Sequence, residues 1–358
     1  MQKIKLRTKI ESMIIIFFVM MISVITVKSL TRTMTDSMDN VDTFIRNSNG
    51  KYWEVTGSNI QAAINDLEMN VLYESRGAPH GTVWLPGNMT ITTSSTIRIK
   101  PHVTLDMGGC VLKPNGNFEV VNLTWGSIIQ NGCINVSGVS NFNKDCIGLY
   151  GWNVINCRNH PPKILDMNLI SAGQRGDGIL FYTGGSEYYN YIQYVDVHNI
   201  KLSGLRIGVH INHTRAGSDS AFINANIFTD IFGYDCKYFI YLYEVDFEAA
   251  GNIFHNAQCY CTANTECIIW NNGAGNIFDN IIAYNWDNAS GTRTSYNFSV
   301  RGPGSNNKAA HQCYLSFIGG GDDIAIGAWE PWTPANRYTI LNLEDSSLTI
   351  GRVYQLAG

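Results

Sequence analysis

Between positions 145 and 285 the chain repeats a two-part pattern of apolar and polar residues five times. Each repeat begins with a short apolar run, such as 238–241, and continues with an alternating run that holds one polar residue, such as 277–281. Alternation over short runs is typical of β-strands. The five polar positions lie 28, 34, 26 and 24 residues apart; they are Asn168, Asp196, Asp230, Asn256 and Asn280.

A period of this length is typical of stacked units that are each too thin to bury a core alone. Short strands with one turn of the chain per repeat predict an all-β, single-stranded parallel β-helix. A leucine-rich repeat would show Leu-x-x-Leu-x-Leu framing, which is missing, and a β-sandwich would show turns about every 8–12 residues. The recurring Asn and Asp predict a ladder of side-chain hydrogen bonds at a bend of each repeat.

Residues 59–69 have helical spacing instead, with Ile60, Ala63, Ile64 and Leu67 on one face. We expect a short amphipathic helix there that covers the N-terminal end of the stack, since an open end exposes unpaired strand edges.

The stretch after this helix resembles a known group of proteins. It reads Gly-Thr-Val-Trp-Leu-Pro-Gly at 81–87 and Val-Thr-Leu-Asp-Met-Gly-Gly at 103–109, with alternating strands between. This order resembles the opening of the pectate-lyase-like superfamily, which includes polygalacturonase-like hydrolases and tailspike depolymerases, and the resemblance covers about residues 56–115. It implies a right-handed parallel β-helix and action on acidic or complex polysaccharide. The positions that carry it predict core residues: Val83, Leu85, Ile91, Ile97, Ile99, Val103 and Leu105.

The ends of the chain differ from the repeats. Residues 1–29 join a basic start to the apolar run 13–27, which is typical of a signal peptide or a membrane anchor. Both alternatives imply export, and a membrane contact would come only from this segment if it stays uncleaved. We expect a linker over 30–55, the β-helix over 56–318, and a C-terminal β cap or assembly segment over 319–358.

Composition agrees with an exported β-rich protein. Charged residues are 15% of the chain, Gly numbers 34, and the net charge is −4. No basic patch stands out, so we expect no nucleic-acid partner. Six Asn-x-Ser/Thr sequons support export: Asn88, Asn122, Asn135, Asn212, Asn288 and Asn297. Several of the nine cysteines are 23 or 24 residues apart, so they would stack on successive repeats as disulfides or as buried thiols.

Candidate chemistry is not that of the polygalacturonase-like hydrolases, whose Gly-His-Gly motif is missing. A second candidate is Glu244-Val245-Asp246-Phe247-Glu248, where alternation on a strand predicts Glu244, Asp246 and Glu248 on one outer face. Clustered carboxylates hold a hard cation such as Ca²⁺ or serve as acid and base. The sequence therefore predicts a calcium site at Glu244, Asp246 and Glu248, with Glu244 and Asp246 also as catalytic candidates.

The repeat before this cluster sends Arg206 and His210 outward by the same alternation, and Asp177 lies one repeat earlier. An Arg, a His and carboxylates on neighbouring repeats resemble a β-helix lyase site, so Arg206, His210 and Asp177 complete the catalytic candidates. An ordinary solvated face with ion pairs is the alternative.

Aromatic side chains predict a sugar groove, because they stack on apolar sugar faces. The candidates are Trp270, Trp286 and Tyr189. The expected function is an extracellular or cell-surface protein that binds polysaccharide or a surface glycan, or cleaves it as a lyase or a glycoside hydrolase. The alternative is a non-catalytic surface or virion protein, and either would suit a homo-oligomer.

Overall fold

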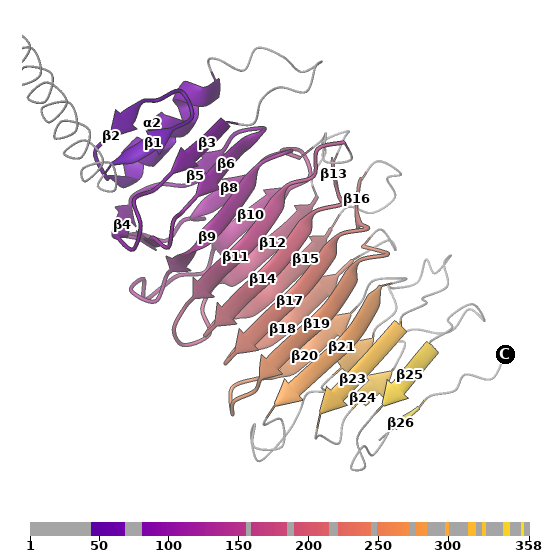
Figure 1. Cartoon of the computed structure of the whole chain (residues 1–358). Coiled ribbons are helices and arrows are strands. Elements are labelled where there is room, and N and C mark those ends of the chain that lie inside the picture. Colours follow the sequence, from indigo (N-terminus) through magenta and orange to yellow (C-terminus); the bar gives the residue numbers. More distant parts are fainter. Residues whose placement is uncertain are drawn as a thin grey trace, which may run out of the picture. The chain divides into compact units, whose positions relative to one another are not determined.

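The computed structural model describes residues 44–68, 81–154, 159–184, 190–214, 221–244, 249–271 and 276–284, together with five later strands (Figure 1). The predicted signal peptide or anchor at 1–29 lies outside the described residues. Among those that are described, no helix is long and apolar enough to cross a membrane.

The strands form two large sheets and one small one. Sheet A holds β1 (Ile45–Asn47), β2 (Tyr52–Trp53), β3 (Gly81–Trp84), β4 (Thr90–Thr93), β6 (Val103–Asp106), β7 (Val111–Pro114), β9 (Ile128–Asn135), β11 (Lys163–Ile170), β14 (Asp196–Ser203), β17 (Ile227–Tyr234), β19 (Ile253–Tyr260), β21 (Ile277–Tyr284), β23 (Tyr314–Gly319) and β25 (Thr339–Leu343). Sheet B holds β5 (Ile97–Ile99), β8 (Val121–Leu123), β10 (Asp145–Tyr150), β12 (Asp177–Thr183), β15 (Ile207–His213), β18 (Tyr238–Tyr243), β20 (Cys267–Asn271), β22 (Phe298–Val300), β24 (Ile324–Ile326) and β26 (Arg352–Val353). Sheet C pairs β13 (Asn190–Gln193) with β16 (Ala221–Asn224).

From β9 onward the chain alternates between sheets A and B, and each strand pairs in parallel with the equivalent strand of the next repeat. The prediction of an all-β chain of parallel strands is confirmed. Most repeats identified in the sequence correspond to these strand pairs, with apolar runs such as 238–241 in sheet B and alternating runs such as 277–281 in sheet A. The run 192–197 is an exception, because it spans the end of β13 in sheet C and the start of β14, and the run 204–207 mostly precedes β15.

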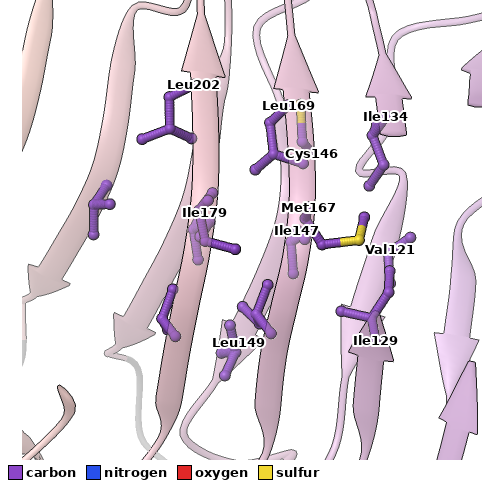
Figure 2. Close-up of a cluster of buried hydrophobic side chains, with 14 of the residues drawn as sticks. Val121, Ile129, Ile134, Cys146, Ile147, Leu149, Met167, Leu169, Ile179 and Leu202 are labelled. Atoms are coloured by element: carbon purple, nitrogen blue, oxygen red, sulfur yellow. The ribbon is translucent and has the colours of Figure 1, made fainter. Parts of the chain in front are cut away.

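The core lies between sheets A and B. Ile147 and Leu149 of sheet B are fully buried, as are Met167 and Leu169 of sheet A (Figure 2). Phe181 from sheet B contacts Phe228 from sheet A, with ring centroids 5.2 Å apart. All seven core residues expected near the N-terminal end are buried, which confirms that prediction.

The expected N-terminal helix is α2 (Gly57–Glu68). Its apolar face is buried at the four expected positions, and the helix packs against β1, β3, β4 and β5. The expected linker differs from the structure, since β1 and β2 fall within it and β1 pairs antiparallel with β3. The C-terminal segment also differs from a separate cap, because β24, β25 and β26 continue sheets B and A in parallel.

The predicted polar column of sheet A is only half right. Asp230, Asn256 and Asn280 do form a ladder of side-chain hydrogen bonds, but its earlier members are Asp166 and Asn199. All five have a φ between 52° and 57°, a left-handed conformation that Asn and Asp tolerate. Asn168 and Asp196 were wrongly assigned, because the ladder follows this backbone kink and not the strand alternation.

A second ladder lies inside the fold, just before β17, β19 and β21. Asn226, Asn252 and Asn276 are fully buried. Asn226 Nδ2 donates to Asn252 Oδ1 over 2.9 Å, and Asn252 Nδ2 donates to Asn276 Oδ1 over 3.0 Å. Their amides also bond backbone groups of the neighbouring repeats, for example Ile223 O. This ladder satisfies the backbone at a bend, which is the role expected for the other column.

Seven cysteines among the described residues are buried free thiols, including Cys110 and Cys133. The cysteines are buried thiols, but the predicted stack is wrong for Cys110 and Cys133, because Cys133 is in register with Val111. Cys157 lies outside the described residues. The sequon at Asn122 is buried within β8 and bonded to Glu119, so this Asn is not open to a glycan in the folded chain.

Candidate functional site

Three of the predicted site residues meet on the outer face of sheet B. Asp177 begins β12, and in register with Ile207 it lies beside the start of β15. Arg206 directly precedes β15 and His210 lies within it. Arg206 Nε and Nη2 donate to the two Asp177 oxygens over 2.8 Å each, and His210 Nδ1 lies 2.7 Å from Asp177 Oδ2.

Asp177 is the buried centre of this group, with 1% of its side chain exposed, whereas Arg206 is 46% exposed and His210 is 12% exposed. Burial acts to raise the pKa of Asp177, but hydrogen bonds from His210 and Arg206 and their charges outweigh it, so this pKa is lowered. The bond with Asp177 raises the pKa of the Arg206 guanidinium. The carboxylate is therefore ionised and holds both partners in place.

This geometry selects one histidine tautomer. An ionised carboxylate accepts hydrogen bonds, so Nδ1 of His210 is the nitrogen that donates to Asp177, and in the neutral ring the lone pair is on Nε2. A buried Asp that orients a His in this way is a recurring arrangement for general-base catalysis.

The Arg206 and His210 side chains form part of the wall of a pocket of about 470 Å³. Lys237, Tyr238 and Tyr241 line it as well, together with Ile207, Asn212, Thr214 and Tyr243. Glu266 fixes two of these groups, because Lys237 Nζ lies 2.7 Å from its Oε1 and Tyr238 donates to its Oε2 over 2.5 Å. The pocket thus combines aromatic surface with two cationic side chains.

Aromatic residues flank the site on both sides along sheet B. Tyr241 stacks on Trp270 with ring centroids 5.7 Å apart and planes 11° apart. On the other side, Tyr150, Trp152 and Tyr182 contact one another. Trp270 thus lies close to the pocket, as predicted, whereas Trp286 and Tyr189 lie outside the described residues.

Glu244 does not join this site, so its predicted outer position is wrong. Strand β18 ends at Tyr243, and its buried residues Ile240 and Leu242 set the inward phase. Glu244 keeps that phase and is 1% exposed, with Oε2 accepting the Ala249 N–H over 2.6 Å. Its calcium partners Asp246 and Glu248 lie outside the described residues. In the part of the chain that is described, no group of three or more His, Cys, Asp or Glu is placed to hold a metal.

Two carboxyls that sequence reasoning missed continue the line of Asp177, one of them buried (Asp145) and the other half-buried (Glu119). Asp145 is in register with Asp177. Val120 N donates to Asp145 O, which places Glu119 beside Asp145 in the preceding repeat. Burial, followed by the charges of Asp177 and Glu119, raises the pKa of Asp145 to about 8. Burial also raises the pKa of Glu119, although Tyr150 and Asn122 donate to its carboxyl.

Asp145 shares one sequence signal with Asp177, since both residues open an apolar run of the repeat. Aligning the repeats by their sheet B strands would have found that pair. Comparison with known proteins found no matching family model, no matching curated protein and no matching solved structure.

Proposed function

We propose that the protein is an exported right-handed parallel β-helix, similar to the pectate-lyase-like superfamily, that binds acidic polysaccharide on the outer face of sheet B and cleaves it there. The observation that carries the proposal is the group of Asp177, Arg206 and His210 at the pocket. The alternation of the chain between two parallel sheets supports the β-helix, and the resemblance over residues 56–115 supports the polysaccharide.

The chemistry that fits this group is proton abstraction beside a uronate carboxylate. His210 Nε2 would accept the proton, because Asp177 holds the other ring nitrogen protonated. Arg206 bonds Asp177 through Nε and one hydrogen of Nη2, so its remaining N–H groups are available to a ligand carboxylate. As the C5 proton passes to His210, the C4–O4 glycosidic bond breaks, a C4=C5 double bond forms, and the leaving O4 takes a proton from solvent, which gives an unsaturated uronate.

The ligand would lie along the stack of strands. Parallel strands are about 4.8 Å apart, which is close to the rise per sugar of an extended polysaccharide. Tyr150, Trp152 and Tyr182 would contact sugars on one side of His210, with Tyr241 and Trp270 on the other.

Binding without catalysis is the second candidate function, for an extracellular or cell-surface adhesion or virion protein. The inward position of Glu244 favours it, because that carboxyl is removed from the outer face where an acid catalyst would act. In either candidate function, any bound calcium would be held by Asp246 and Glu248, the carboxylates that follow Glu244.

The test is a panel of acidic polysaccharides, with and without Ca²⁺, followed by ultraviolet absorbance of unsaturated uronates and by reducing ends. His210→Ala should lower kcat by about 100-fold or more, since a positioned base contributes 10²–10⁴. The matched control is His255→Ala, because His255 Nδ1 lies 2.8 Å from Asp279 on sheet A, away from the pocket. Equal activity of both variants would refute the site, and binding without product would leave the adhesion candidate.

A further inference from the structure

The outer face of sheet A carries two rows of apolar side chains over β17, β19 and β21. Ile227, Ile253 and Ile277 are in register and form one row, which we name the isoleucine row. Tyr234, Tyr260 and Tyr284 are in register near the strand ends and form the tyrosine row. Strands β17, β19 and β21 belong to one parallel sheet (Figure 1), so residues in register form rows straight across it.

These rows are open to solvent. Ile227 is 45% exposed, and the three tyrosines are 38–46% exposed, with Phe232 between the rows at 39%. In the preceding strand β14 the equivalent positions are Asp196, Lys201 and Ser203. The apolar character is therefore confined to one part of a continuous face, and clustered exposed apolar side chains on a soluble protein mark an interaction site.

The tyrosine row does not have the geometry of a sugar platform. The Tyr234 and Tyr260 rings stack on each other at 5.6 Å with planes 28° apart. Their faces cover one another, so the row offers ring edges and hydroxyls to a partner. A sugar stacks on open ring faces, and this face therefore differs from the aromatic pocket of sheet B.

Two carboxylates on this face have a histidine partner within the chain. His255 Nδ1 lies 2.8 Å from Asp279 Oδ2, between the two rows. His198 Nδ1 lies 3.6 Å from Asp230 Oδ2 in the same region. The formal charges of these two pairs are the carboxylates of Asp230 and Asp279, which do not favour an anionic polymer or an anionic membrane surface.

We propose that this face joins two copies of the chain, related by a two-fold axis that runs along β19. A rotation about an axis parallel to the strands keeps each residue at the same height along its strand, so each row faces the same row of the second copy. The same rotation reverses the order of the strands, so β17 faces β21 of the second copy. Ile227 then faces Ile277 of the second copy, Tyr234 faces Tyr284, and Tyr260 faces its own counterpart. Apolar side chains meet apolar side chains at every position of both rows.

The polar residues between the rows fit the same axis. Thr229, His255 and Asp279 are in register on β17, β19 and β21. The axis places the Thr229 hydroxyl opposite the Asp279 carboxylate of the second copy, which is a hydrogen-bonding pair. His255 meets its own counterpart, and each ring has its own Asp279 carboxylate beside it.

The area of this face sets the affinity expected between the two copies. An eight-residue strand is about 26 Å long, and five strands from β14 to β23 span about 24 Å, so each copy offers roughly 600 Å². Two copies bury about 1,200 Å², the low end for a specific interface. We therefore expect a dimer that dissociates on dilution.

Sedimentation of the full chain over about a 100-fold range of concentration tests the proposal. The expected mass rises from 39.8 kDa to twice that value. Tyr260→Glu should stay a monomer throughout, since it places two carboxylates on the axis, whereas Tyr260→Phe should dimerise like the wild type. Lys113→Glu is the matched control, because Lys113 is exposed in β7 of sheet A, outside the five strands of the proposed interface.

Phe232→Asp provides a second variant on the face, and circular dichroism of every variant checks that it is folded. A wild type that stays monomeric, a Tyr260→Glu variant that still dimerises, or a trimer mass would overturn the proposal. The site on sheet B is not involved, so glycan cleavage by the Tyr260→Glu monomer separates this interface from the proposed function.

Discussion

The Asp145 carboxyl is buried beside the ionised Asp177, so its protonation reports directly on the packing of sheet B. We expect Asp145→Asn to change how the free energy of unfolding depends on pH. The substitution keeps the shape of the side chain and removes its ionisation. In the wild type, burial and the neighbouring charges of Asp177 and Glu119 raise the pKa of Asp145 to about 8.

The sign follows from where the proton is held. In the unfolded chain an Asp ionises near pH 3.9, so between about pH 4 and 8 the folded chain holds a proton that the unfolded chain has lost. Raising the pH across this window therefore favours unfolding, by at most about 1.4 kcal/mol per pH unit from this one group. Over the whole window the loss approaches roughly 5 kcal/mol, and above the folded pKa it stops growing.

The Asn variant lacks this pH-dependent contribution to the free energy of unfolding. Its free energy of unfolding should fall less steeply between pH 5 and 8, with the slope smaller by about 1 kcal/mol per pH unit. The gap between variant and wild type should widen with pH in favour of the variant. Urea unfolding at several pH values, followed by circular dichroism, measures both slopes.

Asp196→Asn is the control for this experiment. Asp196 also begins a strand, but its side chain is 42% exposed on sheet A and lies 3.8 Å from Lys163. Its removal should leave the slope close to that of the wild type. Equal slopes for Asp145→Asn and the wild type would refute the reasoning, because they would show that the folded chain binds no extra proton at Asp145.

Three further changes have defined outcomes. Asn252→Ala should lower the free energy of unfolding by about 3 kcal/mol or more, since it leaves buried partners such as Ile223 O without a hydrogen bond. Urea unfolding measures this change. The control is Asn264→Ala at an exposed position, which should stay within about 0.5 kcal/mol of the wild type. Phe254→Ala should cost about 3–5 kcal/mol by the same measurement, because the ring is buried in a stack with Phe228, 4.3 Å away, and its removal leaves a cavity. Asp177→Asn should lower polysaccharide cleavage about as much as His210→Ala, and a pH–rate profile shifted relative to the wild type would separate loss of the base from simple unfolding.

Periodicity was enough to predict much of this fold. Strand alternation and the repeat length predict parallel strands, and the helical spacing of Ile60, Ala63, Ile64 and Leu67 predicts α2. Asp177, Arg206 and His210 could be placed together because residues on adjacent repeats of a parallel stack become neighbours. Their catalytic role stays a prediction.

The errors share one cause, which is that alternation of residue types does not give the phase of a strand. Glu244 follows the inward phase of Leu242, although the run from Glu244 to Glu248 suggests a strand of its own. The kink at Asp230, where φ is 57°, shifts the polar ladder away from plain alternation. Neither feature follows from alternation of residue types, because each depends on backbone dihedrals or on where a strand ends.

The buried asparagine ladder has a consequence for how the length of this protein can change. Each rung bonds the next in the same way, so Asn226 could bond Asn276 if the repeat that carries Asn252 were absent. Removing a full repeat would preserve the ladder, whereas removing part of one would leave a buried amide facing an apolar side chain. The chain can therefore gain or lose length in whole repeats, and the spacing of 24 residues between Asn252 and Asn276 is one such step.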